Sequence, residues 1–344
     1  MTLTMPSQPR IMPALRIPAR PLGAKQSFVF HCNTAQRARL HAWTPIKPPS
    51  TLCKHTPLHL HIQAFHIQSP KNTSYSYTTM SPETKNPSQS AALAQTLKSL
   101  HTPGTPLILT NAWDPPSARA IASLSSTRAL ATASAAIAQA AGLDDQALTF
   151  DANLAAARNI AAVAAEFGLP LTVDFQDGYG ARLEEGVGAL VGMGVVGINL
   201  EDFGREVGGL YGVGEAQERV RRVLRTAEEA GVRDFVVNAR TDALLVGGSI
   251  EEAIERGKAY LEAGATTAFI WGGKERGGMS VEEVKKASKE LEGRLNVSLQ
   301  VVRPGGLTVG ELREIGVARI SLGPQVMVKA MEGVKREMEA IVSG

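Results

Sequence analysis

The sequence predicts a (β/α)8 TIM barrel, an α/β fold, from a repeated pattern and its length. From about residue 90, helical patterns end at glycines, and a short apolar run follows each glycine. Glycine readily adopts the left-handed conformation that ends a helix, and short apolar runs between helices are typical of parallel strands buried on both faces. Eight such runs in roughly 240 residues match the barrel: 107–111, 129–133, 171–175, 196–200, 235–238, 267–271, 295–301 and 318–322.

A doubly wound open sheet is the alternative fold. It is disfavoured because no Gly-rich dinucleotide-binding turn follows the first strand, where Asn111-Ala-Trp-Asp-Pro-Pro116 stands instead. The last helical pattern, about 325–342, supplies the eighth helix of the barrel.

The chain divides by charge into a leader, residues 1–89, and a barrel domain, residues 90–344. Residues 1–82 contain nine Lys or Arg and no Asp or Glu, whereas residues 83–344 contain 27 basic and 33 acidic residues, a formal charge of −6. The acidic part is the one expected to fold, which argues against a nucleic-acid partner. No run of about 18 apolar residues occurs, so no membrane partner is expected.

The leader is expected to be largely disordered, because it lacks hydrophobic periodicity. Its basic, acid-free composition is typical of a transit segment and would place the protein in mitochondria. The alternative is a non-essential extension upstream of a start at Met80, which would leave the protein in the cytoplasm.

Cysteine and histidine are nearly confined to the leader, which holds both cysteines and six of the seven histidines. Only His101 lies beyond it. A disulfide framework, a structural zinc site and a Cys/His catalytic pair are therefore excluded from the barrel. Its chemistry must use carboxylates, arginines, tyrosines, hydroxyls, amides or a bound metal.

The carboxyl ends of the predicted strands carry many polar or aromatic side chains, and a (β/α)8 barrel places its active site at that face. In chain order they are Asn111, Trp113 and Asp114; Thr132 and Ser134; Asp174, Gln176 and Asp177; Glu201 and Asp202; Asn238, Arg240 and Asp242; Trp271; and Arg303.

Asp174 is the best candidate metal ligand, because it ends an apolar strand and an oxygen ligand on a rigid element suits Mg²⁺. Glu201 is a second, since glutamate is a poor N-cap. Asp202 and Asp242 fit a helix-capping or supporting role equally well. Arg240 suits a substrate carboxylate or phosphonate, the alternative being an ion pair with Asp242 or Glu201.

Six motifs in this order resemble the isocitrate lyase/phosphoenolpyruvate mutase superfamily, and most closely its short, phosphonomutase-like members. The resemblance spans about residues 92–341. The motifs are Asn111-Ala-Trp-Asp-Pro-Pro-Ser-Ala-Arg119, Gly142-Leu-Asp-Asp145, Asp174-Phe-Gln-Asp-Gly-Tyr-Gly180, Ile198-Asn-Leu-Glu-Asp202, Asn238-Ala-Arg-Thr-Asp242 and Ile320-Ser-Leu-Gly-Pro324.

The resemblance implies a barrel enzyme with Mg²⁺, or Mn²⁺ as an alternative, at its mouth. The substrate would be a small carboxylate or phosphonate that reacts through an enolate. Asp174 would bind the metal directly, Asp145 and Glu201 through water, with Gln176 in the same set. The other candidates are catalytic or contact the substrate: Arg240, Tyr179 and Ser134 for catalysis; and Trp113, Ser134, Gly180, Arg240 and Asn238 for binding.

Trp113 and Trp271 would flank the substrate or simply plug the mouth. The resemblance also implies a homodimer or homotetramer, because family members exchange a C-terminal helix between subunits. Here little of the chain lies beyond the eighth helix to exchange.

The sequence departs from the family pattern at three places. Gln176 replaces an acid, so weaker metal binding is expected unless Asp177 turns in to compensate. The loop after Glu201 lacks the Lys-Lys/Arg-Cys-Gly-His motif of the true lyases, which argues against isocitrate or methylisocitrate cleavage by the usual mechanism. The serine usual after the second strand appears as Ala133, with Ser134 beside it.

The loop 204–214 contains glycines that could act as hinges over a substrate. Arg205, Glu206 or Tyr211 would then transfer a proton, the alternative being a flexible connection without a catalytic residue.

The leading hypothesis is therefore a Mg²⁺-dependent lyase or phosphonomutase-like enzyme acting on a C–C or P–C bond of a small 2-oxo or hydroxy carboxylate. The alternatives are a hydrolase of oxaloacetate-like or phosphonopyruvate-like compounds, and a barrel that has lost catalysis and serves as a binding protein.

Overall fold

The computed structural model describes residues 87–344 except 274 and 301–305. The predicted disorder of the leader thus lies almost entirely outside the described residues, as does the strand-end candidate Arg303. One boundary is corrected: residues 87–89, assigned to the leader, form the start of helix α1 (Pro87–Ser99).

A parallel sheet closes into the predicted barrel. Its order is β1-β11-β10-β9-β8-β5-β4-β3-β2, and β1 and β2 are separated only by Thr110, so together they occupy one strand position. The eight predicted strands are confirmed: β1 (Leu107–Leu109) with β2 (Asn111–Ala112), β3 (Leu130–Thr132), β4 (Leu171–Asp174), β5 (Gly197–Glu201), β8 (Val236–Thr241), β9 (Thr267–Ile270), β10 (Leu295–Ser298) and β11 (Arg319–Ser321).

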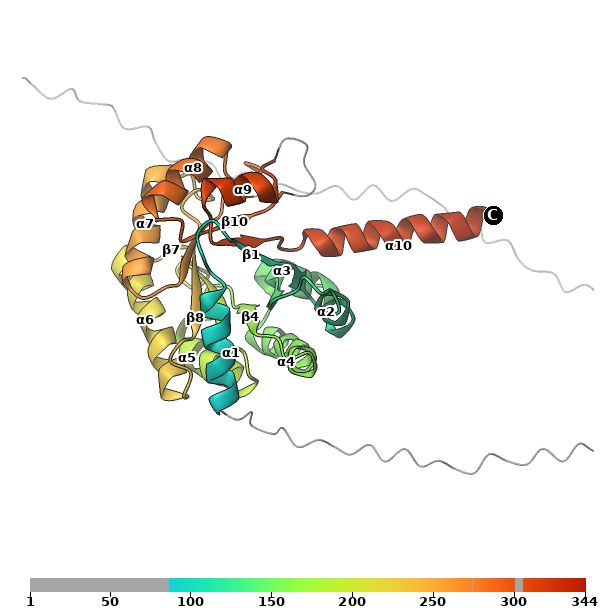
Figure 1. Ribbon diagram of the computed structural model, residues 1–344, viewed down its shortest axis with the longest axis horizontal. Coiled ribbons are helices and arrows are strands. Elements are labelled where there is room, and N and C mark those ends of the chain that lie inside the picture. The colour runs from blue at the N-terminus through green and yellow to red at the C-terminus, as the bar shows by residue number, and fades with distance from the viewer. Residues whose placement is uncertain (1–86, 274, 301–305) are drawn as a thin grey trace, which may run out of the picture. The chain divides into compact units, whose positions relative to one another are not determined.

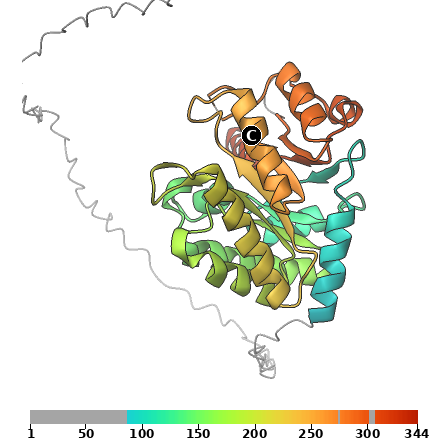
Figure 2. The same ribbon diagram turned by 90° about the vertical axis from the view of Figure 1, so that its left-hand side faces the viewer.

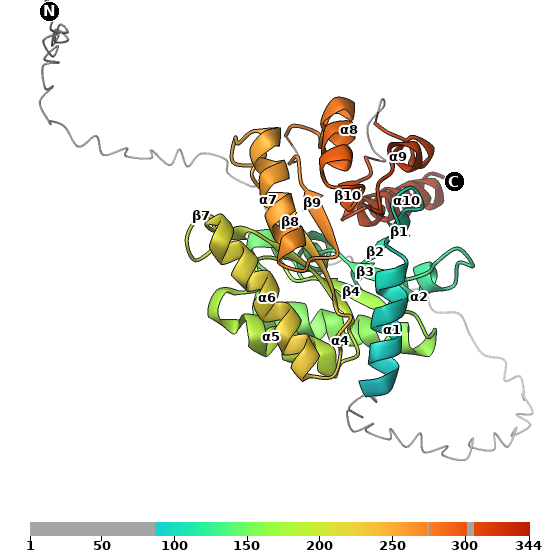
Figure 3. The same ribbon diagram turned by 60° about the vertical axis from the view of Figure 1, so that its left-hand side comes forward.

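Helices surround the sheet (Figure 1, Figure 3). The predicted helix-ending glycines 168, 194, 231, 264, 293 and 316 all have positive φ. No described helix is long and apolar enough to cross a membrane. The helices are α2 (Pro115–Ala122), α3 (Ser134–Ala140), α4 (Phe150–Glu166), α5 (Leu183–Gly192), α6 (Val213–Glu229), α7 (Ile250–Glu262), α8 (Val281–Glu290) and α9 (Val309–Ile315), with 3-10 turns η1 (Asp145–Ala147) and η2 (Gly180–Arg182).

Helix α1 lies at the end of the barrel opposite the polar strand ends. Its Leu97 is fully buried and lies beside Gly197 and Val236, the first residues of β5 and β8. At this end of the barrel, Leu97 therefore packs an apolar side chain against the start of β5. Figure 2 shows α1 in cyan beside the barrel.

The last helix, α10 (Gln325–Ser343), projects from the barrel (Figure 1). Met327 in its first turn is buried, whereas an apolar stripe further along is exposed: Val328, Met331, Val334, Met338 and Ile341. Ile108 of β1 is also 42% exposed. Both apolar surfaces thus lack cover in the single chain.

An aromatic cluster lies next to the end of β4, between β4 and the start of α4. Phe150, Phe175 and Tyr179 make edge-to-face contacts with ring centroids 5.2–6.1 Å apart. Gly186 of α5 makes room for this cluster, because a Cβ there would lie 2.2 Å from Phe175 Cζ. Gly188, also in α5, has nothing within 4 Å of the same hypothetical atom.

These two glycines provide a matched test of the packing behind β4. We expect Gly186→Ala to lower the free energy of unfolding by about 1–3 kcal/mol, because the aromatic rings must shift. We expect Gly188→Ala to raise it by up to about 1 kcal/mol, because alanine favours the helix. Urea unfolding of both variants measures the difference, and equal effects would contradict the packing argument.

Candidate active site

Asp174 is held rigidly at the end of β4. Its Oδ2 accepts a hydrogen bond from the Ser134 backbone N–H at 2.9 Å, and its Oδ1 accepts one from Asn199 Nδ2 at 3.1 Å. Its own backbone N–H donates to Thr132 Oγ1 at 2.9 Å. Three strands and the start of α3 therefore fix the predicted metal ligand in place.

A ladder of polar side chains supports Asp174 from within the barrel. Asn199, Asn238 and Thr267 occupy neighbouring register positions on β5, β8 and β9. Asn238 Nδ2 donates to Asn199 Oδ1 at 2.5 Å, and Thr267 Oγ1 donates to Asn238 Oδ1 at 2.6 Å. Asn238 is completely buried. In the described residues its side chain supports Asn199 and, through Asn199, Asp174, and its contact with a substrate stays a prediction.

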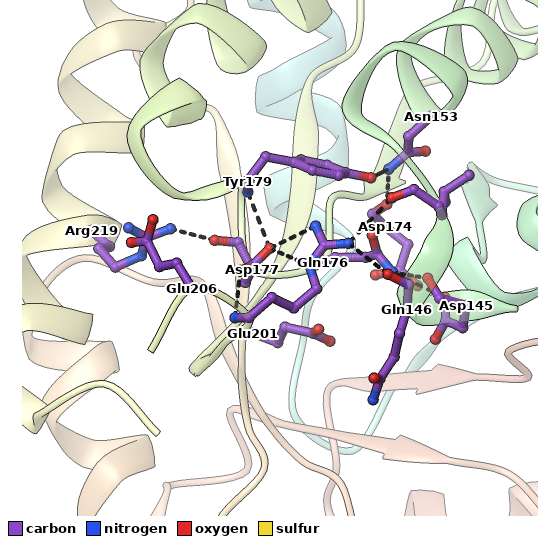
Figure 4. A network of polar contacts seen from close by, with 12 residues as sticks. Asp145, Gln146, Asn153, Asp174, Gln176, Asp177, Tyr179, Glu201, Glu206 and Arg219 are labelled. Atoms are coloured by element: carbon purple, nitrogen blue, oxygen red, sulfur yellow. Dashed lines mark hydrogen bonds and ion pairs between the residues drawn. The ribbon is translucent and has the colours of Figure 1, made fainter. Parts of the chain in front are cut away.

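Gln176 lies beside Asp145 in a strained turn. Its φ is +49°, which is uncommon for a residue other than glycine. Its Nε2 donates to the Asp145 backbone oxygen at 2.8 Å and to Asp145 Oδ1 at 3.0 Å (Figure 4). The Gln176 Oε1 atom is buried and has no hydrogen-bond partner. Ser134 also donates a side-chain hydrogen bond to Asp145.

Arg240 is paired with two carboxylates. Its Nε and Nη2 donate to the Asp242 carboxylate at 2.7 and 2.9 Å, and its Nη1 lies 2.8 Å from Glu201 Oε2. The guanidinium carbon sits 4.2 Å from the ring centroid of Trp271. Both ion pairs considered as the alternative role of Arg240 are therefore present.

Negative charge is concentrated at this mouth. Burial raises the pKa of Asp145, with repulsion from Asp174 adding to the effect. Burial also raises the pKa of Glu201 well above its usual range, which Arg240 opposes and three neighbouring aspartates reinforce. Burial alone would lower the pKa of Arg240, but Asp242 and Glu201 raise it. The arginine is thus a permanent cation among carboxylates that repel one another.

Asp177 does not turn into the metal site. It is almost fully buried and binds Arg205 instead: its Oδ1 accepts from Arg205 Nη2 at 2.9 Å, and its Oδ2 from the Arg205 backbone N–H at 3.0 Å. The Tyr179 N–H also donates to Asp177 (Figure 4). In these contacts Asp177 does not replace the negative charge that Gln176 lacks at the candidate metal site.

The loop 204–214 begins as an ordered hairpin, not as a flexible connection. Strands β6 (Phe203–Gly204) and β7 (Gly209–Leu210) pair antiparallel, and Arg205 stacks over the Tyr179 ring at 4.5 Å. Tyr211 is buried, and its hydroxyl donates to Glu206 Oε1 at 3.1 Å. The three candidate proton-transfer residues of this loop are thus held in structural contacts here.

The remaining candidates lie around this centre. The Tyr179 hydroxyl accepts from Asn153 Nδ2 at 3.0 Å, and burial raises the pKa of Tyr179 to about 12, so the phenol is protonated at neutral pH. Gly180, expected to contact the substrate, has φ +62°, and the Glu206 carboxylate fills the space where its Cβ would lie. Trp113 packs against Ala133 and Met327 at the rim.

Sequence reasoning overlooked two functional neighbours. Asn199 could have been found, since it stands two residues before Glu201 on the same strand and therefore shares its face. The pairing of Arg205 with Asp177 had no sequence signal, because it depends on how the hairpin folds back.

The mouth fits a hard cation that keeps part of its water shell. The available donors are all oxygens, from Asp145, Asp174, Glu201 and Gln176, and the Gln176 Oε1 has no partner. In the described part of the chain, no three acidic, His or Cys side chains are close enough to hold a metal by themselves. Mg²⁺ bound through one or two carboxylates and several waters suits such a set.

This (β/α)8 barrel, with acids and the partly buried Arg240 at its mouth, belongs to the phosphoenolpyruvate mutase/isocitrate lyase superfamily, as its family match and its relatives show. The family described as phosphoenolpyruvate phosphomutase matches residues 97–342, and the chain belongs to this family. Its relatives include lyases and phosphonomutases, which identifies the chain as a lyase- or mutase-like enzyme whose reaction is not specified.

Related proteins cover different shares of the chain. A Burkholderia cenocepacia J2315 structure, provisionally named a phosphonomutase, is 31% identical with a TM-score of 0.64, covering 73% of this chain and 99% of that one. Oxaloacetate acetylhydrolase is 26% identical with a TM-score of 0.62, covering 71% and 85%. The 2-methylisocitrate lyase of Escherichia coli K12 is 35% identical over 111 residues, 29% of this chain and 36% of the lyase.

The Arg205–Asp177 pair gives a prediction about the hairpin. We expect a double-mutant cycle of Arg205→Met and Asp177→Asn to yield a coupling energy of about 1–3 kcal/mol in urea unfolding, because Asp177 is buried. Backbone amides of residues 204–210 should also exchange faster with deuterium in both single variants.

The control for this cycle is the exposed pair Arg182–Glu185. Removing it with Arg182→Met should leave the hairpin exchange unchanged, because exposed pairs contribute little. A coupling energy of zero between Arg205 and Asp177 would show that the pair does not hold the hairpin.

Proposed function

We propose that the protein is a Mg²⁺-dependent lyase or phosphonomutase-like enzyme that cleaves or rearranges a C–C or P–C bond of a small 2-oxo or hydroxy carboxylate. The observation that carries this proposal is the meeting of Asp145, Asp174 and Glu201 with Arg240 at one barrel mouth. Acids and an arginine in one site can hold a cation and an anionic substrate together.

The relatives support the substrate class. Those named above act, by their names, on oxaloacetate and 2-methylisocitrate, and one relative's structure contains the product oxalate. Members of this superfamily generally depend on Mg²⁺. Small carboxylates of this kind match a site in which Arg240 lies at the barrel mouth with Asp145, Asp174 and Glu201.

The side chains at the barrel mouth would have two roles, to hold the metal and to bind the substrate. Asp174 would bind Mg²⁺ directly, and Asp145, Glu201 and Gln176 would hold its waters. When bound, the ion supplies Lewis-acid stabilisation of the negative charge that develops on an enolate oxygen. Asp242 keeps two nitrogens of Arg240 oriented, while Nη1, now paired with Glu201, is the donor that a substrate carboxylate would take over.

A hydrolase is the second candidate, favoured because the hairpin lacks the Cys, Lys and His residues of the lyase loop. Product analysis in ¹⁸O-labelled water separates the two reactions, since only hydrolysis incorporates solvent oxygen into a product carboxylate or phosphate. A screen of 2-oxo acids and phosphonates that gave no turnover would favour a binding protein instead.

The metal assignment is tested by titrating Mg²⁺ into the full chain by calorimetry. We expect one site, and we expect Asp174→Ala to weaken binding at least about tenfold, because the direct ligand is lost. Asp234→Asn, a partly exposed acid paired with Lys98, is the control and should bind like the parent protein. Equal binding by parent and Asp174→Ala, or none by either, would refute the assignment.

We also propose that two copies of the chain pair through α10, within the homodimer or homotetramer expected from the family resemblance. The helices of a (β/α)8 barrel form an outer ring. Here α10 projects away, leaving both its apolar stripe and Ile108 exposed. A second copy offers a complementary apolar surface for each.

Substitutions in α10 test this pairing. We expect the double variant Val334→Glu, Met338→Glu to reduce the mass in solution to the 36.5 kDa of one chain, because two charges enter an apolar contact. Lys335→Glu, next to Val334, should leave the oligomer intact. Light scattering after size exclusion measures both, and an unchanged mass in the double variant would disprove the pairing.

A further inference from the structure

Asp202 lies behind Arg240 and makes more polar contacts than a helix cap needs. It is 3% exposed, and Oδ1 accepts from the Asp242 backbone N–H at 2.8 Å. Oδ2 accepts from the Tyr260 hydroxyl at 2.6 Å and from Arg256 Nη1 at 3.2 Å. Arg256 and Tyr260 of α7 thus hold the Asp202 carboxylate, which in turn binds the main chain just after β8.

The main chain of Asp202 extends the same connection. Its N–H donates to the Arg240 carbonyl oxygen at 3.0 Å. Together with the bond to the Asp242 N–H, this fixes the backbone on both sides of Thr241. The Asp242 carboxylate, which orients two nitrogens of Arg240, therefore rests on a backbone position set by Asp202.

Asp202 also holds the base of the hairpin. Its carbonyl oxygen accepts from the Tyr211 N–H at 2.9 Å, and Arg256 Nη1 donates to the Tyr211 carbonyl oxygen at 3.0 Å. The Tyr211 ring packs under Arg219, whose guanidinium carbon lies 4.4 Å from the ring centroid. Asp202 thus connects Arg240 with the segment that closes the hairpin, through its own main chain and through the Arg256 side chain that its carboxylate binds.

We propose that Asp202 is a positioning residue that fixes Arg240, through Asp242, in the orientation that binds a substrate carboxylate, and ties this orientation to the hairpin base at Tyr211. The role in substrate binding rests on the proposed function, whereas the effect on Arg240 itself can be measured without any ligand. Asp202 touches no reacting atom, so it acts only through these neighbours.

The test uses three variants of the full chain. Asp202→Asn keeps the size and removes the charge that Arg256 and Tyr260 bind. Tyr260→Phe removes one hydrogen bond to Asp202 and leaves the carboxylate, so it remains informative if Asp202→Asn does not fold. Glu184→Gln, which loses a partly exposed pair with Arg222, is the matched acid-to-amide control.

The ligand-free measurement is the rate at which phenylglyoxal modifies Arg240, followed by peptide mapping. We expect Asp202→Asn to raise this rate about tenfold and Tyr260→Phe about two- to threefold, as hydrogen bonds to the buried carboxylate are lost. Arg319, which is also 3% exposed but lies on β11 away from Asp202, is the internal reference, because a general loosening would raise its rate as well. Glu184→Gln should change neither rate.

The ligand measurement titrates oxalate in the presence of Mg²⁺, and Mg²⁺ alone. We expect each variant to weaken oxalate binding by about the factor by which it raises the phenylglyoxal rate of Arg240. Mg²⁺ binding should stay unchanged, because Asp174 is held by Ser134, Asn199 and Thr132. A loss of both affinities together would indicate a merely structural role and would overturn the inference.

The outcomes separate the two proposals. If the parent protein binds neither Mg²⁺ nor oxalate, the proposed function fails, and the phenylglyoxal rates still decide whether Asp202 positions Arg240. If Arg240 reacts at the parent rate in the folded variants, or only in proportion to Arg319, Asp202 is not a positioning residue, whatever the protein binds.

Discussion

The constraint on which the rest of the site depends is the repulsion among neighbouring carboxylates, of which Asp242 is buried, Asp174 and Glu201 are partly buried and Asp145 is exposed. Asp145, Asp174, Glu201 and Asp242 face one barrel mouth, and Arg240 is the cation paired with two of them. Burying like charges is costly unless they are paired or bind a cation. The amide donors of Ser134 and Asn199 and the double pairing of Arg240 offset part of this cost within the described residues.

The replacement of an acid by Gln176 changes how this charge is distributed. An amide can donate, and Gln176 uses its Nε2 to hold Asp145, which a carboxylate could not do. Asp177 is then committed to Arg205 rather than to the mouth. Gln176 thus lowers the negative charge at the predicted metal position and holds Asp145. Asp177, the next residue, binds Arg205 of the hairpin instead.

The fold was predictable from sequence because its signals are local. An apolar run and a helix-ending glycine each depend on a few neighbouring residues, and all eight strand positions followed from them. The site was predictable only where a side chain ends its own strand, as Asp174, Glu201 and Arg240 do. The full burial of Asn238 was not predictable, because a position near the end of a strand does not reveal depth. The pairing of Arg205 with Asp177 was not predicted, because the two residues lie 28 positions apart in the chain.

The pairing of Arg240 with Glu201 has a consequence for the order in which metal and substrate would bind on the proposed function. A substrate carboxylate that approaches Nη1 must displace Glu201 and would leave that acid unpaired beside Asp145 and Asp174. An unpaired buried carboxylate is strongly unfavourable. A cation already bound near Asp174 would give Glu201 a new partner through water, so metal binding favours the release of Arg240. The charge balance at the barrel mouth therefore favours binding of the metal first and of the substrate second.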